Sequence, residues 1–285
     1  MQAAGELEGL SIFFHGWHVE AIQLGPRSAE AAVSCHASSS HRVLRLRAGS
    51  ALVVRGTVQE ERCCALLADS SQPVLRLFGE NLQSNVLMMA GPVSRMDLFI
   101  SAGASLVALI ADSPASMAQG TWRVCASVET NAATLVGYMR GAEYEGPIES
   151  SLASHLQKVI AASSILELER GTRSARVSAV VRACRLIEED FPSSLSLRDL
   201  SRRSGVAERT LEYGFKHVYG TTPLTFVRSQ RLTRSRLALL TSKRRTSISE
   251  TARQFGFRHM GQYCRDYRRL FGETPSMTLA RRHPP

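Results

Sequence analysis

The C-terminal part of the chain contains an internal repeat, and this repeat restricts the fold more than any other feature. Tyr267 follows Phe215 by 52 positions, and each of these aromatic residues stands five positions before a Gly-x-Thr-Pro motif. Further upstream, residues 197–205 parallel residues 248–256, and both segments end in glycine. The offset here is 51 positions, and a turn accommodates a difference of one residue more easily than a helix does. The repeat therefore predicts two copies of one small structural unit.

Each copy is typical of two helices joined by a short turn. The turn falls at Gly205 in the first copy and at Gly256 in the second, because glycine adopts a left-handed backbone without a steric penalty. The second helix of each copy ends at the Gly-x-Thr-Pro motif. This pattern is a helix-turn-helix unit, whose second helix enters the major groove of DNA while the first crosses the backbone. We predict such units at residues 196–217 and 247–269.

Residues 223–240 join the two units and are expected to form one basic helix. The segment begins with Pro223, which is tolerated in a first helical turn, and its apolar residues leave several arginines for a polar face. A helix of about 17 residues spans about 25 Å at about 1.5 Å per residue. A rigid linker of that length can hold two recognition helices near the spacing of about 34 Å between successive major grooves.

The positive charge of the chain is concentrated in the same region. The whole chain has a net charge of +10. Residues 178–285 contain 21 Lys and Arg against 9 Asp and Glu, whereas residues 1–177 contain 14 against 16. Charge separated in this way produces a one-sided field that attracts a polyanion. No stretch approaches the ~18 consecutive apolar residues of a membrane-spanning helix, so we expect nucleic acid as the partner and no membrane.

Several spaced motifs in this region resemble the DNA-binding domain of the AraC/XylS family of transcription regulators. They are Gly220-Thr-Thr-Pro223, Ile248-Ser-Glu-Thr-Ala252, Gly256-Phe257 and Gly272-Glu-Thr-Pro275. The resemblance covers about residues 177–282. It implies a sequence-specific, effector-responsive activator that binds double-stranded promoter DNA and contacts RNA polymerase. It also implies a cupin-like N-terminal barrel used for sensing a small-molecule effector or for dimerisation.

The N-terminal part of the chain has the short period of β-strands. Short apolar or alternating runs, such as residues 42–47 and 105–110, are separated by turn residues. Their even spacing favours a compact barrel or sandwich. Together with the resemblance, this pattern predicts an α+β protein of two domains. We expect a cupin-like β-barrel at residues 1–145, a helical linker at 146–176 and an all-α DNA-binding domain at 177–285.

An apolar stripe marks a further helix at residues 151–168. Leu152, Leu156, Val159 and Ile160 recur at helical spacing, so one face of this helix needs an apolar partner. The partner is either the barrel of the same chain or the same helix of a second chain. Our hypothesis is that the protein forms a homodimer through this helix.

Two sets of polar residues are expected to contact DNA. Base contacts are expected on the outward faces of the recognition helices, since arginine can donate two hydrogen bonds to guanine and glutamate can accept one from cytosine. The candidates are Glu208, Arg209, Glu212 and Tyr213 in the first unit and Arg258, His259, Gln262 and Arg265 in the second. Candidates for phosphate contacts, which position a protein without reading sequence, are Lys216, Arg228, Arg231, Arg234, Arg244 and Arg245. Gly214 stands inside the first recognition helix, where glycine costs up to ~1 kcal/mol relative to alanine.

The sequence contains no recognisable enzymatic motif. We find no Ser-His-Asp set, no glycine-rich phosphate loop and no acidic pair, and the histidines lack the His-x-His pattern of enzymatic cupins. We therefore expect no metal and no other cofactor, and, without a secretory signal, a cytoplasmic protein. Two alternatives stay open. One is a ligand-independent repressor or architectural DNA binder, and the other is a cupin-type enzyme fused to a DNA-binding domain.

Overall fold

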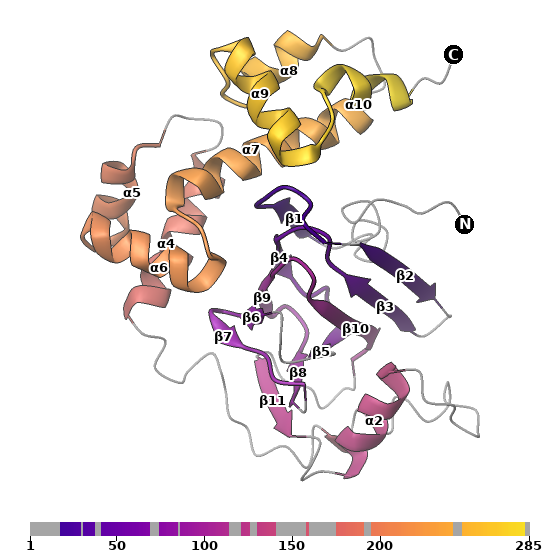
Figure 1. Cartoon of the computed structure of the whole chain (residues 1–285). Helices are drawn as coiled ribbons and strands as arrows, with labels where there is room; N and C mark the ends of the chain where they lie inside the picture. Colours follow the sequence, from indigo (N-terminus) through magenta and orange to yellow (C-terminus); the bar gives the residue numbers. More distant parts are fainter. Residues whose placement is uncertain are drawn as a thin grey trace. The chain divides into compact units, whose positions relative to one another are not determined.

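The chain divides into two compact units. The computed structural model describes residues 18–29, 31–37, 41–68, 74–84, 86–113, 121–125, 130–140, 158–159, 175–190, 195–241 and 247–282. The first unit comprises Met1–Ala21 and Ser28–Arg173, and the second comprises Ile22–Arg27 and Ser174–Pro285. Nearly all the strands belong to the first unit and most of the helices to the second (Figure 1).

The described strands of the first unit form two antiparallel sheets. The five-stranded sheet has the order β1 (His18–Gln23), β4 (Leu52–Thr57), β9 (Arg95–Ile100), β6 (Leu75–Leu77) and β7 (Glu80–Asn81). The six-stranded sheet has the order β11 (Thr121–Cys125), β8 (Val86–Ala90), β5 (Arg62–Ala68), β10 (Ser105–Asp112), β3 (His41–Arg47) and β2 (Ala32–Ala37). Within the described part of the chain, the outermost strands of each sheet pair on one side only. The sequence favours a barrel or a sandwich, and the described strands form a sandwich without closing into a barrel.

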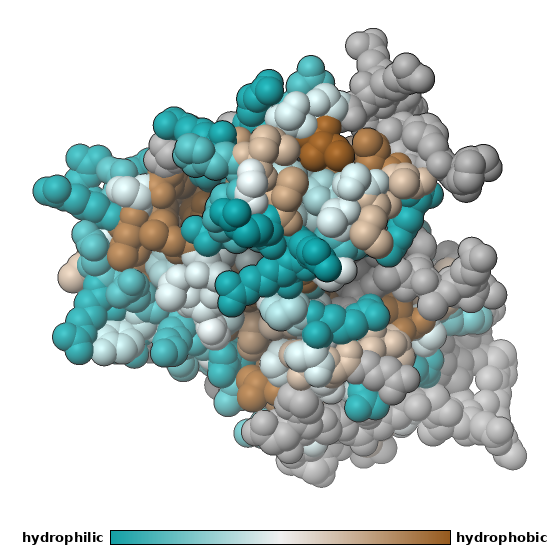
Figure 2. Space-filling model, turned by 45° about the horizontal axis from the view of Figure 1, so that its top comes forward, coloured by the Kyte–Doolittle hydropathy of each residue, from teal (hydrophilic) through white to brown (hydrophobic). Residues whose placement is uncertain are grey.

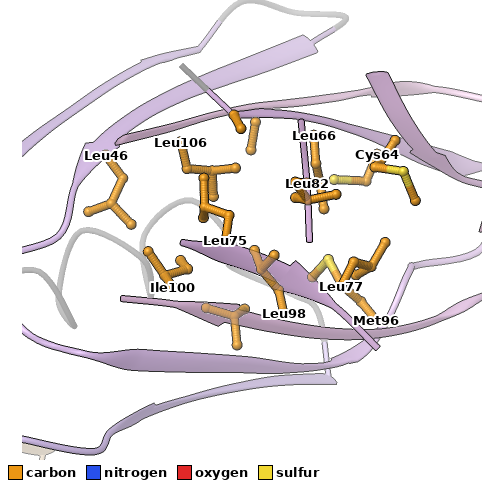
Figure 3. Close-up of a cluster of buried hydrophobic side chains, with 14 of the residues drawn as sticks. Leu46, Cys64, Leu66, Leu75, Leu77, Leu82, Met96, Leu98, Ile100 and Leu106 are labelled. Atoms are coloured by element: carbon orange, nitrogen blue, oxygen red, sulfur yellow. The ribbon is translucent and has the colours of Figure 1, made fainter. Parts of the chain in front are cut away.

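A core of apolar side chains fills the space between the two sheets. Leu106 and Ile110 of β10 point into this core, because alternate residues of a strand face the same side. Figure 3 shows Leu66 and Leu106 of the six-stranded sheet facing Leu75 and Leu98 of the five-stranded sheet. Each fully buried leucine contributes about 1.5–3 kcal/mol relative to an exposed one. This core holds the two sheets together.

The outer face of the six-stranded sheet carries a second core. Val107 and Leu109 of β10 pack there with Leu135 and Met139 of α2 (Thr130–Arg140). β10 is therefore buried on both faces, which explains why its sequence is apolar almost throughout.

One residue of the apolar stripe predicted at residues 151–168 belongs to this second core. Val159 is fully buried in it, together with side chains of β10 and α2. Lys158 and Val159 are described, whereas the other residues of the predicted helix, including Leu152, Leu156 and Ile160, lie outside the described part of the chain. At Val159 the stripe thus contacts the sheet of its own domain, which is one of the two alternatives that the sequence leaves open.

The second unit consists of two groups of helices joined by one long helix (Figure 1). The first group contains α4 (Ala175–Glu189), α5 (Leu197–Ser204) and α6 (Glu208–Tyr219). The second group contains α8 (Ile248–Gln254), α9 (Met260–Phe271) and α10 (Pro275–Arg282). The joining helix α7 (Pro223–Thr241) has 19 residues and is about 28 Å long at about 1.5 Å per residue. The two helix-turn-helix units and their helical linker are confirmed, and α6 and α9 occupy the positions expected for the recognition helices.

Glycine forms the turn inside each helix-turn-helix unit. Gly205 follows α5 with φ of 71°, and Gly256 lies in the equivalent turn after α8 with φ of 80°. Both values fall in the left-handed region, where a residue with a Cβ atom is strained. The turn positions predicted from the repeat are therefore confirmed.

The Gly-x-Thr-Pro motif ends one helix and begins the next. Gly220 ends α6 and Gly272 ends α9, and both glycines adopt a left-handed conformation. The backbone N–H of each glycine donates to the carbonyl oxygen four residues earlier. Thr222 and Thr274 then cap α7 and α10, because each hydroxyl oxygen accepts the backbone N–H three residues later at 3.3 Å. Proline occupies the first position of both following helices, as its fixed φ favours.

The linker helix α7 contributes to a separate core in each group. Near its start, Phe226 packs against Phe215 and Tyr219 of α6, with ring centroids 5.5 and 4.9 Å away. Further along the helix, Leu232 and Leu239 are buried among side chains of α8 and α9. Aromatic pairs at such distances stabilise by about 0.5–1.5 kcal/mol beyond their burial. One unbroken helix thus fixes both recognition helices.

Gly214 lies where α6 approaches α4 closely. A Cβ atom at this position would stand 2.7 Å from Cγ2 of Val180 and 3.2 Å from Cγ of Arg176. Val180 is itself fully buried and branched at Cβ, so it has little freedom to move. The glycine that weakens α6 as an isolated helix therefore permits its contact with α4.

We expect Gly214→Ala to destabilise the protein by about 1–3 kcal/mol, because overpacking outweighs the higher helix propensity of alanine. Gly261 of α9 provides the matched control. Its added Cβ would meet only Nη1 of Arg265, at 3.8 Å, so Gly261→Ala should be neutral or stabilise by up to ~1 kcal/mol. Denaturant unfolding followed by far-ultraviolet circular dichroism measures both changes. Equal effects of the two substitutions would contradict close packing at Gly214.

Candidate nucleic-acid interface

The outward face of α6 carries the base-contact candidates of the first unit. Glu208, Arg209, Glu212 and Tyr213 are all exposed, whereas Leu211 of the same helix is fully buried. Nε and Nη2 of Arg209 donate hydrogen bonds to the Tyr213 hydroxyl at 3.3 and 3.1 Å. Because a guanidinium has five N–H donors, this contact leaves others for a base edge. The face therefore combines positive and negative hydrogen-bonding groups on one recognition helix.

The candidates of the second unit lie at the start and on the outward face of α9. Arg258 and His259 precede the helix, His259 being its N-cap, and both are exposed. Gln262 and Arg265 are exposed one turn further on, and Nη2 of Arg265 donates to Oε1 of Gln262 at 2.9 Å. Nε2 of Gln262 donates to Oδ1 of Asp266 at 2.8 Å. All eight base-contact candidates thus lie on the surface.

Two tyrosines hold the inward face of α9. Tyr263 and Tyr267 are fully buried. The Tyr263 hydroxyl donates to Oγ of Ser235 in α7 at 3.3 Å, and the Tyr267 hydroxyl is 2.8 Å from Oγ1 of Thr278 in α10. Burial raises the pKa of both tyrosine hydroxyls above the ordinary value. They stay neutral and fix the rotation of α9 about its axis.

Four of the six phosphate-contact candidates belong to the described residues. Lys216 and Arg228 are exposed, whereas Arg231 and Arg234 are half-buried. Burial lowers the pKa of the Arg231 guanidinium, although an arginine stays charged at neutral pH. Arg228 lies near a carboxylate of the recognition helix, with Nε 3.8 Å from Oδ2 of Asp266. Arg244 and Arg245 lie outside the described residues.

The repeat relates further basic residues that the sequence-based selection omits. Arg202 in α5 and Arg253 in α8 stand 51 positions apart, which is the offset of the turn glycines, and both are exposed. Arg268 in α9 follows Lys216 of α6 by 52 positions and is also exposed. Applying the repeat offset to each basic residue would have found them. Hydrophilic side chains cover much of the visible surface of the helical unit in Figure 2.

Arg236 of α7 differs from the exposed basic residues because its side chain is largely buried. The Arg236 side chain is 12% exposed, and its Nε and Nη2 both donate to Oε1 of Glu273 at 3.2 Å. Oε1 of Glu273 also accepts from the Thr278 hydroxyl at 2.8 Å, and Oε2 lies 2.7 Å from Nη2 of Arg281. We call these four residues the Glu273 cluster. It joins α7 to α10, so Arg236 has a structural partner instead of facing DNA.

The described residues contain no group of three or more His, Cys, Asp or Glu side chains placed to hold a metal ion. None of the described helices combines the length and the apolar content that crossing a membrane requires. Cys63 and Cys64 are buried as free thiols in the strand unit, and burial raises the pKa of Cys63 to about 12. That thiol stays protonated at neutral pH and packs as a small apolar side chain.

Comparison with known proteins identifies relatives of the C-terminal unit. A helix-turn-helix domain family matches residues 200–281, which include both recognition helices. The chain is 35% identical over 139 residues to the XylDLEGF operon transcriptional activator 2 of Pseudomonas putida, a match that covers 45% of this chain and 85% of that protein. It is also 35% identical over 129 residues to the XylDLEGF operon transcriptional activator 3 of the same species, covering 43% of this chain and 39% of that relative.

A solved structure is also similar to part of the chain. It is a probable AraC family transcriptional regulator from Rhodopseudomonas palustris CGA009, 30% identical, with a TM-score of 0.35, and the match covers 37% of this chain and 98% of that one. The sequence relatives carry the assignment, since the first of them is matched over most of its length. The exposed faces of α6 and α9 are those with which a helix-turn-helix unit contacts DNA. The chain belongs to the AraC/XylS family and is a DNA-binding transcription regulator.

Proposed function

We propose that this regulator is an effector-responsive activator that binds promoter DNA with both helix-turn-helix units at once. The observation that carries the proposal is the attachment of α6 and α9 to one helix. Phe226 holds α7 to α6, and Leu232 and Leu239 hold it to α8 and α9, so the two recognition helices cannot rotate independently. A rigid pair of this kind suits two successive major-groove segments on one face of a duplex.

In this proposal, two groups of side chains contact different parts of the duplex. The base edges are contacted by Glu208, Arg209, Glu212 and Tyr213 of the first unit and by Arg258, His259, Gln262 and Arg265 of the second. The phosphates are contacted by Lys216, Arg228, Arg231, Arg234, Arg244 and Arg245, and also by Arg202, Arg253 and Arg268. Phosphate contacts supply affinity for any sequence, and base contacts supply the preference for one.

We expect Arg209→Ala and Arg265→Ala each to weaken specific binding by about 1–3 kcal/mol, because each removes a possible bidentate contact to guanine. The full chain is used to enrich a site from a randomised duplex pool, and anisotropy titrations compare that site with a random duplex. Both substitutions should lower affinity for the enriched site more than for the random duplex. Arg253→Ala, which removes a proposed phosphate contact, should weaken both equally. Equal losses for Arg209→Ala and Arg265→Ala would assign them to phosphates.

The N-terminal unit is proposed to be the cupin-like sensor and dimerisation domain that the resemblance implies. The Pseudomonas putida relatives are transcriptional activators by name, which supports activation over repression. Contact with RNA polymerase is part of the same proposal and rests on the resemblance. A reporter gene placed behind the enriched site distinguishes activation from repression, because the regulator raises transcription in the first case and lowers it in the second. An effector that binds the folded protein should raise its unfolding temperature. Once the effector concentration exceeds the dissociation constant, the increase should grow with the logarithm of that concentration.

A further inference from the structure

Four polar side chains form a connected network between α9 and α7. Asp266 of α9 accepts a hydrogen bond from Nε2 of Gln262 at 2.8 Å, and its other oxygen lies 3.8 Å from Nε of Arg228 in α7. Gln262 accepts through Oε1 from Nη2 of Arg265 at 2.9 Å. The Asp266 side chain is 13% exposed, whereas Gln262 and Arg265 face outward. We call these four residues the Asp266 network.

The network determines which way the Gln262 amide faces. An ionised carboxylate only accepts hydrogen bonds, so the amide nitrogen of Gln262 must face Asp266. A guanidinium only donates, so the amide oxygen must face Arg265. If the amide were rotated by half a turn, its oxygen would face the Asp266 carboxylate, and both groups are acceptors. Its nitrogen would face the Arg265 guanidinium, and both groups are donors. Asp266 and Arg265 therefore lock one orientation of the side chain.

The locked amide and guanidinium keep free hydrogen-bonding capacity. Gln262 uses one of its two amide N–H groups and one of the two lone pairs on Oε1, and Arg265 uses one of five N–H groups. Adenine offers N7 and the N6 amino group to a glutamine, and guanine offers O6 and N7 to an arginine. Gln262 and Arg265 are three positions apart, so they are neighbours on one helix face. Neighbouring side chains of a helix in the major groove can contact successive base pairs.

We propose that Asp266 is a positioning residue through which the second helix-turn-helix unit reads an A·T pair next to a G·C pair, by Gln262 and Arg265 respectively. This inference rests on the proposed function, because it assumes that α9 enters the major groove. Asp266 itself acts through its neighbours and touches no base. The negative charge of Asp266 also repels the DNA phosphates. Removing Asp266 should therefore raise the affinity for any duplex but lower the preference for the specific site.

Two substitutions of Asp266 distinguish the orientation of Gln262 from the loss of the negative charge. Asp266→Ala removes both the negative charge and the acceptor that orients Gln262. Asp266→Asn removes the same charge but keeps a carbonyl oxygen that can accept from Nε2 of Gln262. Both variants should bind a random duplex more tightly than the unmodified protein, and to the same extent. The ratio of specific to random affinity should fall about tenfold for Asp266→Ala and markedly less for Asp266→Asn.

Glu250 provides the control for charge alone. It is exposed in the first turn of α8, in the same helix-turn-helix unit. Glu250→Gln should raise affinity for the enriched site and the random duplex by the same factor and leave their ratio unchanged. Circular dichroism of each variant confirms that the helices are intact before the titrations are compared.

The test is repeated enrichment of the randomised duplex pool with the full-length variants. The unmodified protein should enrich a site that contains an adjacent A·T and G·C pair, and Asp266→Ala should lose preference at those two positions while the rest of the site persists. Failure of the unmodified protein to enrich any site would overturn the proposed function itself. Enrichment of a site that Asp266→Ala reproduces unchanged would overturn the positioning role and leave the proposed function standing.

Discussion

Affinity for a specific duplex should fall about a thousandfold when monovalent salt rises from about 50 to about 200 mM. The reason is the release of counterions from each phosphate that a basic side chain neutralises, here for about six phosphates. Of the proposed phosphate contacts, five fall on described residues that are exposed, namely Arg202, Lys216, Arg228, Arg253 and Arg268. Anisotropy titrations at several salt concentrations should give a slope of about −5 for the logarithm of affinity against that of salt.

The salt response also distinguishes phosphate contacts from base contacts. A random duplex should show weaker binding with a similar slope, because both duplexes present the same phosphates. Arg253→Ala should reduce the slope by about 1, since it removes one proposed phosphate contact. Arg236→Gln, in the Glu273 cluster, should leave the slope unchanged although it removes a positive charge, because that residue is largely buried beside Glu273. A nearly flat salt dependence would exclude the proposed interface.

Glu273→Ala should destabilise the DNA-binding unit by about 3–5 kcal/mol, the usual cost of removing one partner from a buried ion pair. The Glu273 side chain is 5% exposed, and the substitution leaves the guanidinium of Arg236 buried without its carboxylate. It also removes the acceptor of the Thr278 hydroxyl. Denaturant unfolding followed by far-ultraviolet circular dichroism measures the loss, because the helices of this unit dominate that signal.

Arg281→Ala is the matched control for this ion pair. Arg281 contacts the same carboxylate but is 63% exposed, so its loss should cost no more than about 1 kcal/mol. Both tryptophans of the chain, Trp17 and Trp122, fall within the residue ranges of the other unit, so tryptophan fluorescence does not report on the helical unit. A small effect of Glu273→Ala, comparable to that of Arg281→Ala, would show that the Glu273 cluster does not hold α10 to α7.

The resemblance and the repeat together predicted most of the candidate interface. The eight base-contact candidates are all exposed, and they precede or lie on α6 and α9. This outcome is expected because the positions of the buried residues in an amphipathic helix also define its outward face. The repeat offset, applied more widely, would have added Arg202, Arg253 and Arg268. The contacts of all these residues with DNA stay a prediction.

Other features depended on distances between residues far apart in the chain. Gly214 looks unfavourable in its own helix, and only the position of Val180 in α4 explains it. Arg236 resembles its neighbouring arginines in sequence, but Glu273 of another helix buries and pairs it. The strand spacing was equally compatible with a barrel and a sandwich, and the pairing of the described strands decided for two open sheets.

From the sequence alone came the duplicated helix-turn-helix unit, its glycine turns, the Gly-x-Thr-Pro motif at the end of each second helix, and the linker helix. These features depend on backbone preferences and hydrogen bonds among residues a few positions apart, so local sequence is sufficient to specify them. The tertiary structure alone decided which arginines are buried, why Gly214 is a glycine, and that Arg228 of α7 lies beside Asp266 of α9. Such contacts depend on how helices pack, which no local pattern of residues encodes.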